Sequence, residues 1–137
     1  MRNELLAIED AELHLSILRK IAAQAGFTTT SANSLDVAAR LLEQRSFDVI
    51  TLDLSLGQES GIEVLELLAR MKCGTPVLVI SASDDDVLKD IVRIGNGFNL
   101  NLHPPIPKPI NLAALRQALL RIGGDAAPHG LVAAGEA

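Results

Sequence analysis

The sequence of 137 residues is 48% hydrophobic and 21% charged, which fits one globular domain of ordinary size. Aromatic residues make up only 2% of the chain, and 12 lysines and arginines stand against 17 aspartates and glutamates, for a net charge of −5. A nucleic-acid surface needs basic groups near phosphates and rings that stack on bases, so we expect no nucleic-acid partner. The single cysteine, Cys73, excludes an internal disulfide bond and a cysteine-based zinc site.

The start of the chain does not have the pattern expected of a signal peptide. The N-terminal segment is polar, and no apolar run is long enough to cross a bilayer, so we expect a cytoplasmic protein without membrane contact. Residues 125–137 lack a periodic apolar face. We therefore expect one domain over residues 1–124, followed by a disordered tail.

Five short apolar runs alternate with segments of helical periodicity. We predict strands at residues 5–8, 27–32, 47–52, 76–80 and 100–106. Near-continuous apolar runs are typical of parallel strands buried between two layers of helices. Proline cannot donate to a strand ladder, so the proline-rich fifth strand should lie at an edge. The pattern predicts an α/β fold, with a doubly wound, parallel (βα)5 sheet in the order 2-1-3-4-5.

The first predicted helix ends at Gly26 and carries one apolar face. His14 lies on this face, which favours a histidine at the edge of the core over a catalytic one. Leu15 lies opposite to it, so we expect an exposed leucine beside the functional site, suited either to solvent or to a partner protein. The apolar face consists of Leu13, Ile17, Leu18, Ile21 and Ala25.

Capping residues mark the starts of other helices. Ser34 and Asn111 are the predicted N-caps of the second and fifth helices. The fourth helix is expected to open at Ser83, where the carboxylates of residues 84–86 complement the helix dipole rather than hold a metal. The apolar faces of the third and fifth helices are expected to consist of Ile62, Leu65, Leu68 and Ala69, and of Leu112, Leu115, Leu119 and Ile122, with the fifth helix ending before Gly123.

Acidic residues follow two of the predicted strands. Glu9 and Asp10 come after the first strand, and Asp53 comes after the third. In an open α/β sheet, ligands bind beyond the carboxyl ends of the strands where the strand order reverses, so these three carboxylates should converge. A hard divalent cation stabilises such a cluster, and two carboxylates with a phosphate oxygen form a common magnesium site. The sequence therefore predicts Mg²⁺ as the cofactor.

The residues at these strand ends could also carry out phosphoryl transfer. The Asp53 carboxylate can act as a nucleophile and accept a phosphoryl group as an acyl phosphate. Lys108, after the fifth strand, and the metal would then neutralise the phosphoryl oxygens, and the Ser81 hydroxyl would donate a hydrogen bond to one of them.

These motifs resemble the receiver domain of bacterial two-component response regulators, over about residues 4–122. Each motif is short, but all occur in order at the ends of the proper strands. The matching residues are Glu9-Asp10, Asp53 with Gly61 eight positions later, Ser81 in Val-Leu-Val-Ile-Ser-Ala, and Lys108-Pro109.

The resemblance implies a role for each matching residue. Asp53 would be the phospho-acceptor, Asp10 a direct metal ligand and Glu9 a ligand through water. The backbone carbonyl of Ser55 would be the remaining protein ligand of the metal. Ser81 would be the switch hydroxyl, and Lys108 the amine that binds the phosphoryl group.

The sequence departs from the family pattern at the switch. Pro105 stands where receivers usually carry an aromatic residue, and Gly57 replaces a common proline. The segment between Ser81 and Lys108 is also longer than usual, with glycines at 95 and 97. Because Pro105 has no ring to rotate, we expect the signal to leave through the fourth helix and a mobile segment at residues 95–101.

The implied function is that of a phospho-accepting signalling module, an enzyme only toward its own phosphoryl group. It would take the phosphoryl group from a histidine of a sensor kinase or phosphotransfer protein and then engage an unknown downstream protein. One alternative is a degenerate receiver that signals without phosphate, which the intact acidic set disfavours. A haloacid-dehalogenase-type phosphatase needs an aspartate where Ser55 stands, and a flavodoxin-type nucleotide binder would have its phosphate repelled by Glu9 and Asp10.

Overall fold

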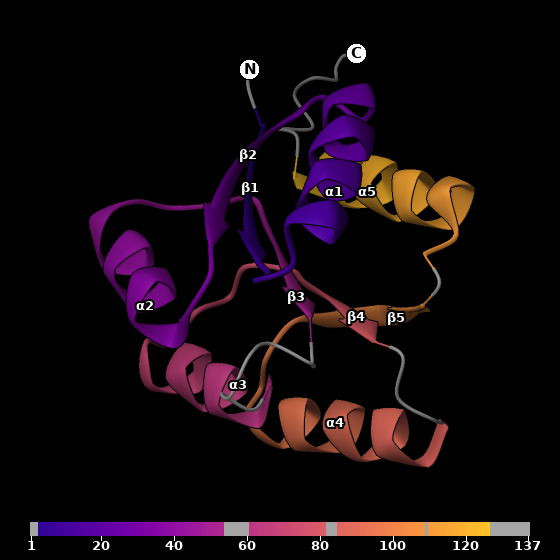
Figure 1. The fold of residues 1–137 in the computed structure, drawn as a ribbon. Helices are drawn as coiled ribbons and strands as arrows, with labels where there is room; N and C mark the ends of the chain where they lie inside the picture. The colour runs from indigo at the N-terminus through magenta and orange to yellow at the C-terminus, as the bar shows by residue number, and fades with distance from the viewer. Residues whose placement is uncertain (1–2, 54–60, 82–84, 109, 127–137) are drawn as a thin grey trace.

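The computed structural model describes residues 3–53, 61–81, 85–108 and 110–126. Strands and helices alternate along these residues, as the apolar periodicity predicts (Figure 1). The elements are β1 (Asn3–Ile8), α1 (Glu12–Gln24), β2 (Phe27–Ala32), α2 (Leu35–Gln44), β3 (Val49–Asp53), α3 (Gly61–Arg70), β4 (Val77–Ser81), α4 (Asp85–Gly97), β5 (Leu102–Pro107) and α5 (Leu112–Ala126).

The five strands form one parallel sheet in the order β2-β1-β3-β4-β5. This confirms the predicted fold class and strand order, including the position of the proline-containing β5 at an edge. The order reverses between β1 and β3, which lie side by side in the middle of the sheet. Their carboxyl ends therefore form the switch point at which doubly wound sheets bind ligands.

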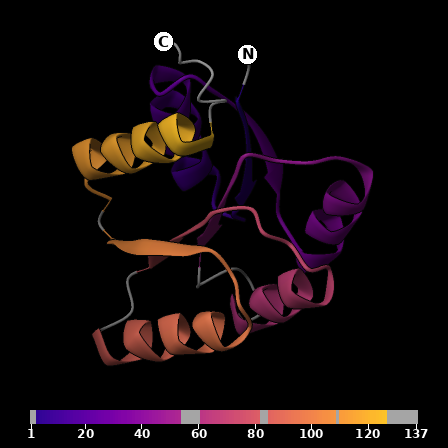
Figure 2. The same cartoon turned by 180° about the vertical axis from the view of Figure 1, so that it is seen from behind.

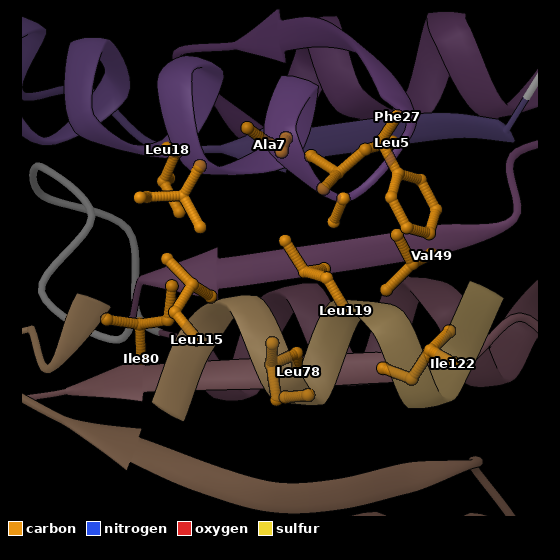
Figure 3. Close-up of a cluster of buried hydrophobic side chains, with 14 of the residues drawn as sticks. Leu5, Ala7, Leu18, Phe27, Val49, Leu78, Ile80, Leu115, Leu119 and Ile122 are labelled. Atoms are coloured by element: carbon orange, nitrogen blue, oxygen red, sulfur yellow. The ribbon is translucent and has the colours of Figure 1, made fainter. Parts of the chain in front are cut away.

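Helices cover both faces of the sheet. Helices α1 and α5 lie together on one face, and α2, α3 and α4 lie on the other (Figures 1 and 2). Each face has its own apolar core, because successive strand residues point to opposite sides. Figure 3 shows the first core, where Leu115, Leu119 and Ile122 of α5 pack over the strands. Burying each such side chain contributes about 1.5–3 kcal/mol.

Two predicted helix caps are confirmed. The Ser34 hydroxyl accepts a hydrogen bond from the backbone N–H of Val37 at 3.3 Å, and the Asn111 side-chain oxygen accepts one from Ala114 at 3.0 Å. The predicted cap Ser83 and its neighbour Asp84 lie outside the described residues. These caps fix where α2 and α5 begin, and thus hold the loops that precede them.

The predicted apolar face of α1 is wrong at two positions. Leu13 is 72% exposed, whereas Leu15, which was expected to be exposed, is only 8% exposed. The buried face is set by the 3–4 spacing of Leu15, Leu18 and Ala22, and Leu13 falls outside it. Ile62 and Leu112, also assigned to apolar faces, are exposed as well. All three exposed residues lie in the first turn of a helix that begins beyond the carboxyl edge of the sheet, where the strands no longer cover them.

Helix α5 runs past its predicted end. It continues through Gly123 to Ala126, so the first two residues of the expected tail are helical. A Cβ atom at Gly123 would lie 3.2 Å from the Asn3 side chain and 3.4 Å from the ring of Phe27. The glycine therefore serves the close packing of α5 on β1 and β2 rather than ending the helix.

Helix α4 includes part of the segment at residues 95–101 that is predicted to be mobile. It extends to Gly97, and Gly95 is buried against β5. The helix ends in a Schellman motif: Asn99 has a φ of 60°, and the Leu100 N–H donates to the Gly95 carbonyl at 3.0 Å. Residues 95–97 are therefore helical, and Gly95 allows α4 to pack closely on Leu102 of β5. The expected mobility of residues 95–101 stays a prediction.

Arginines cover the outer strand β2 from both sides. Arg19 of α1 donates to the Thr29 carbonyl and the Ser31 hydroxyl, each at 3.3 Å. Arg45, at the end of α2, donates to the Thr30 hydroxyl and stacks over the Phe47 ring at 4.8 Å. The side chains of β2 alternate between the two faces of the sheet, so each arginine reaches the hydroxyls on its own side.

Among the described residues, no helix combines the length and apolar character that crossing a bilayer requires.

Candidate functional site

Four of the predicted site residues lie at the carboxyl edge of the sheet. Glu9 follows β1, Asp53 is the last residue of β3, Ser81 is the last residue of β4, and Lys108 follows β5. Backbone hydrogen bonds hold the edge together: the Lys108 N–H donates to the Ser81 carbonyl at 2.9 Å, and the Glu9 N–H donates to the Ala32 carbonyl at 2.9 Å. The strands themselves therefore position these side chains.

Strand alternation brings the two buried acids to one face. Ala7 and Val49 point into the core beneath α1 and α5. Glu9 lies two residues beyond Ala7, and Asp53 lies four beyond Val49, so both carboxylates rise on that same face. Glu9 is 2% exposed and Asp53 is 4% exposed. The protein thus places two carboxylates next to each other almost out of contact with water.

The amine of Lys108 reaches this pair of acids. Its Nζ atom lies 2.8 Å from Oδ2 of Asp53, a charge-assisted hydrogen bond between two largely buried side chains. The predicted meeting of Asp53 with a lysine at the end of the fifth strand is therefore present in the structure.

His14 is a member of the site that sequence reasoning assigned to the edge of the core. Its Nδ1 atom lies 3.2 Å from Nζ of Lys108, 3.6 Å from Oε1 of Glu9 and 4.0 Å from Oδ2 of Asp53. An ammonium group can only donate, so Nδ1 is the acceptor in this contact, which corresponds to the ring tautomer with its proton on Nε2. His14 lies in the first turn of α1, which overhangs the carboxyl edge, and that position was the signal that could have identified it.

The surroundings of Glu9 disfavour its ionised form. Burial, a hydrogen bond shared with Asp53 and the negative charge of Asp53 together raise the pKa of Glu9 from 4.5 to about 7. The Ala11 N–H, which donates to Oε2 at 3.0 Å, and the Lys108 ammonium act in the opposite direction. Two buried carboxylates thus share one lysine, which leaves a surplus of negative charge.

This donor set fits a divalent cation. Carboxylate oxygens of Glu9 and Asp53 converge, and the ligand-type atoms of Glu9, His14 and Asp53 all lie within 4.8 Å of one another. Of the predicted metal ligands, Asp10 is exposed and the structure does not bring it into this group. Ser55 lies outside the described residues.

Ser81 lies at the end of β4, beside Pro107 of β5. Ser81 is 2% exposed. By strand alternation, its side chain shares the parity of Val77 and Val79, which face α4 rather than α1. Pro105 is half-buried within the edge strand β5.

The fold and the site define a doubly wound domain with a lysine-paired aspartate at its switch point. The family model described as "Response regulator receiver domain" matches residues 5–120, and the chain belongs to this family. It is therefore a receiver domain of the response regulator family, whose members are phospho-acceptor signalling modules rather than classical enzymes.

Relatives carry the same kind of domain. The chain is 30% identical over 124 residues to the alginate biosynthesis transcriptional regulatory protein AlgB of Pseudomonas putida, covering 88% of this chain and 27% of the relative. It is 27% identical over 128 residues to the alkaline phosphatase synthesis transcriptional regulatory protein PhoP of Bacillus subtilis, covering 93% and 52%. The chain thus spans about a quarter to a half of the length of these regulators.

Solved structures share the fold. The signal receiver domain of a putative LuxO repressor protein from Vibrio parahaemolyticus matches with a TM-score of 0.80 at 21% identity, covering 97% of this chain and 98% of that one. The receiver domain of the Francisella response regulator 1452 matches with a TM-score of 0.77 at 22% identity, covering 90% and 98%.

Proposed function

We propose that Asp53 accepts a phosphoryl group in a magnesium-dependent transfer from a phosphohistidine of a sensor kinase or phosphotransfer protein. The observation that carries this proposal is the 2.8 Å contact between Lys108 and Asp53 at the switch point, beside the buried Glu9. It combines a nucleophilic carboxylate with a fixed positive charge, the pair that phosphoryl transfer to an acid needs.

The transfer itself uses few groups of the protein. An Asp53 oxygen attacks the phosphorus, the bond from phosphorus to the donor histidine nitrogen breaks, and that nitrogen keeps the electron pair. The Lys108 ammonium, already directed at Asp53, stabilises charge on the phosphoryl oxygens. Glu9, Asp53 and, through a small movement of its loop, Asp10 would hold Mg²⁺. The bound ion would supply further neutralisation of those oxygens.

Ser81 and Pro105 indicate how phosphorylation of Asp53 would change the rest of the domain. We infer that the Ser81 hydroxyl turns toward the phosphoryl group and carries the segment that follows β4 with it, so that α4 changes its contacts. Proline at 105 leaves no aromatic side chain to move within β5. The moving element would therefore be the backbone that leads into α4, which presents its surface to a downstream protein.

Intact-mass measurement tests the acceptor. With Mg²⁺ and acetyl phosphate, the protein should gain one phosphoryl group, and Asp53→Ala should abolish the gain. Asp36→Ala removes an exposed carboxylate of α2 and should leave it unchanged. A gain of mass that persists in Asp53→Ala would contradict the assignment. Asp10→Ala should weaken Mg²⁺ binding in a titration followed by amide NMR.

A degenerate receiver is the second candidate. The exposure of Asp10 and the proline at 105 favour it, since both depart from a conventional metal site and switch. Absence of phosphorylation in the wild-type protein, under conditions where Mg²⁺ binding is demonstrated, would support this candidate over the first.

We also propose that the receiver domain is complete without the C-terminal tail. Helix α5 contributes Leu115, Leu119 and Ile122 to the core, and residues beyond Ala126 carry none of the site residues. Removing residues 127–137 should leave the melting temperature and the phosphorylation of Asp53 unchanged. A large fall in melting temperature would contradict the proposed boundary.

A further inference from the structure

The acidic cluster contains an imidazole as well as carboxylates. Glu9, His14 and Asp53 come from three different elements: the end of β1, the first turn of α1 and the end of β3. One ligand atom from each lies within 4.8 Å of the other two. The Nδ1 atom of His14 is 3.6 Å from a Glu9 oxygen and 4.0 Å from an Asp53 oxygen. Ligands that surround one ion at about 2.0–2.2 Å are separated by distances of this size.

The ring of His14 is already oriented to bind a cation. Its Nδ1 atom faces the Lys108 ammonium at 3.2 Å, so its lone pair points into the cluster and its N–H points away. A metal ion needs this same tautomer, and replacing the ammonium at Nδ1 requires no proton movement on the ring. The same ammonium also contacts Oδ2 of Asp53, so an ion bound between Nδ1 and Oδ2 would take its place beside both atoms. The His14 side chain is 33% exposed, which gives an ion a path to Nδ1.

An imidazole changes which ions a carboxylate site prefers. Mg²⁺ binds oxygen atoms almost exclusively, whereas imidazole nitrogen is a good ligand of Co²⁺, Zn²⁺ and other first-row transition metals. We propose that His14, Glu9 and Asp53 form a site for a first-row transition-metal ion, which binds more tightly than Mg²⁺ because of the His14 nitrogen. The inference deepens the proposed function and rests on it for the metal-binding role of the two carboxylates.

Cobalt provides a direct probe, since its visible absorption bands report nitrogen ligation and geometry. The full chain is titrated with Co²⁺, and separately with Mg²⁺, for the wild type and for His14→Gln, His103→Gln and His129→Gln. The two latter variants are matched controls, because His103 lies on β5 outside the cluster and His129 lies in the C-terminal segment. Far-UV circular dichroism establishes that each variant is folded.

The expected result separates His14 from the other histidines. His14→Gln should raise the Kd for Co²⁺ by about 10-fold or more, since even indirect partners of a metal contribute 10–100-fold, and should leave the Kd for Mg²⁺ unchanged. The controls should match the wild type in affinity and absorption. In imidazole NMR spectra, Co²⁺ should shift the His14 signals at one equivalent while those of His103 stay in place.

Two results would overturn the inference: a His14→Gln protein that keeps the wild-type Co²⁺ affinity and spectrum, or a wild type that binds Mg²⁺ as tightly as Co²⁺. Neither outcome depends on phosphorylation. If Co²⁺ binds through His14 and Asp53 still takes no phosphoryl group with Mg²⁺, the metal site stands and the proposed transfer fails.

Discussion

Nζ of Lys108 and Oδ2 of Asp53 lie 2.8 Å apart, although the two residues are separated by 55 positions in the chain. Both side chains are largely buried, so each charge depends on the other for compensation. The contact links β3 to the far edge of the sheet and fixes the amine over the acid before any phosphoryl group arrives. Preorganisation of this kind lowers the cost of forming charge during transfer.

Removal of the amine should therefore destabilise the protein through Asp53. At pH 8, Lys108→Met leaves a buried carboxylate without a cation and should lower the free energy of unfolding by about 3–5 kcal/mol. In an Asp53→Asn background, Lys108→Met should lower the free energy of unfolding far less, because the carboxylate is already absent. Urea unfolding of the four proteins forms a double-mutant cycle. Equal costs in both backgrounds would show that the ion pair does not stabilise the fold.

Glu9 should make the stability of the metal-free protein depend on pH. Its pKa is raised to about 7 in the folded protein and returns toward 4.5 on unfolding, so the folded state binds more protons between these values. The free energy of unfolding should therefore fall as the pH rises from 4.5 through 7. When unfolding is measured in EDTA across this pH range, the free energy of unfolding should fall less steeply for Glu9→Gln than for the wild type. Glu66→Gln, at an exposed site on α3, should follow the wild type, and identical profiles for all three proteins would refute the assignment to Glu9.

Substitution by alanine should affect stability very differently at the two leucines near the start of α1. Leu15→Ala removes a buried side chain and should cost about 2–5 kcal/mol of unfolding free energy. Leu13→Ala, at a site that is 72% exposed, should change it by less than about 0.5 kcal/mol. Thermal or urea denaturation compares the two directly. A larger loss from Leu13→Ala would mean that the buried face of α1 is the one expected from the sequence.

Gly95 should not tolerate a side chain. An alanine Cβ there would lie 2.2 Å from Cδ1 and 2.9 Å from Cγ of Leu102, so the Leu102 side chain or one of the two elements must shift, and overpacking of this kind costs about 1–3 kcal/mol. Gly97 is the matched control, because a Cβ at that position meets no atom within 4 Å. Gly97→Ala should be neutral or stabilising by up to about 1 kcal/mol, as helix propensity favours alanine. Leu102→Ala should relieve the Gly95→Ala defect, and a Gly95→Ala protein as stable as the wild type would exclude this packing.

The fold could be predicted from the sequence because its signals are repeated and local. The central strands β1, β3 and β4 contain short apolar runs, and Ser34 and Asn111 mark helix starts through bonds to residues three positions away. The prolines of β5 required an edge position for that strand, which the order 2-1-3-4-5 provides. The predicted convergence of Glu9 and Asp53 followed from the same rules, since parallel strands end at one edge.

The remaining features depend on where a helix lies in space. Whether Leu13 or Leu15 faces the core is decided by the rotation of α1 on the sheet, and apolar residues occur on both sides of its first turn. The same rotation carries His14 over the acids. From the sequence alone, Gly95 and Gly123 suggest helix ends. In the structure, each glycine lies inside a helix and leaves room for a side chain of another element, Leu102 of β5 at Gly95 and Phe27 of β2 at Gly123.

The protection of the two edge strands bears on how this domain can meet other molecules. On β2, the guanidinium groups of Arg19 and Arg45 engage a carbonyl and hydroxyls along the strand. On β5, prolines at 104, 105 and 107 lack the N–H groups that an added strand would need. Addition of a partner strand at β5 is therefore disfavoured, and at β2 it would compete with the bond from Arg19 to the Thr29 carbonyl. Recognition of a partner would then fall to helices and loops, the parts of the molecule that the proposed phosphorylation of Asp53 would rearrange without breaking the sheet.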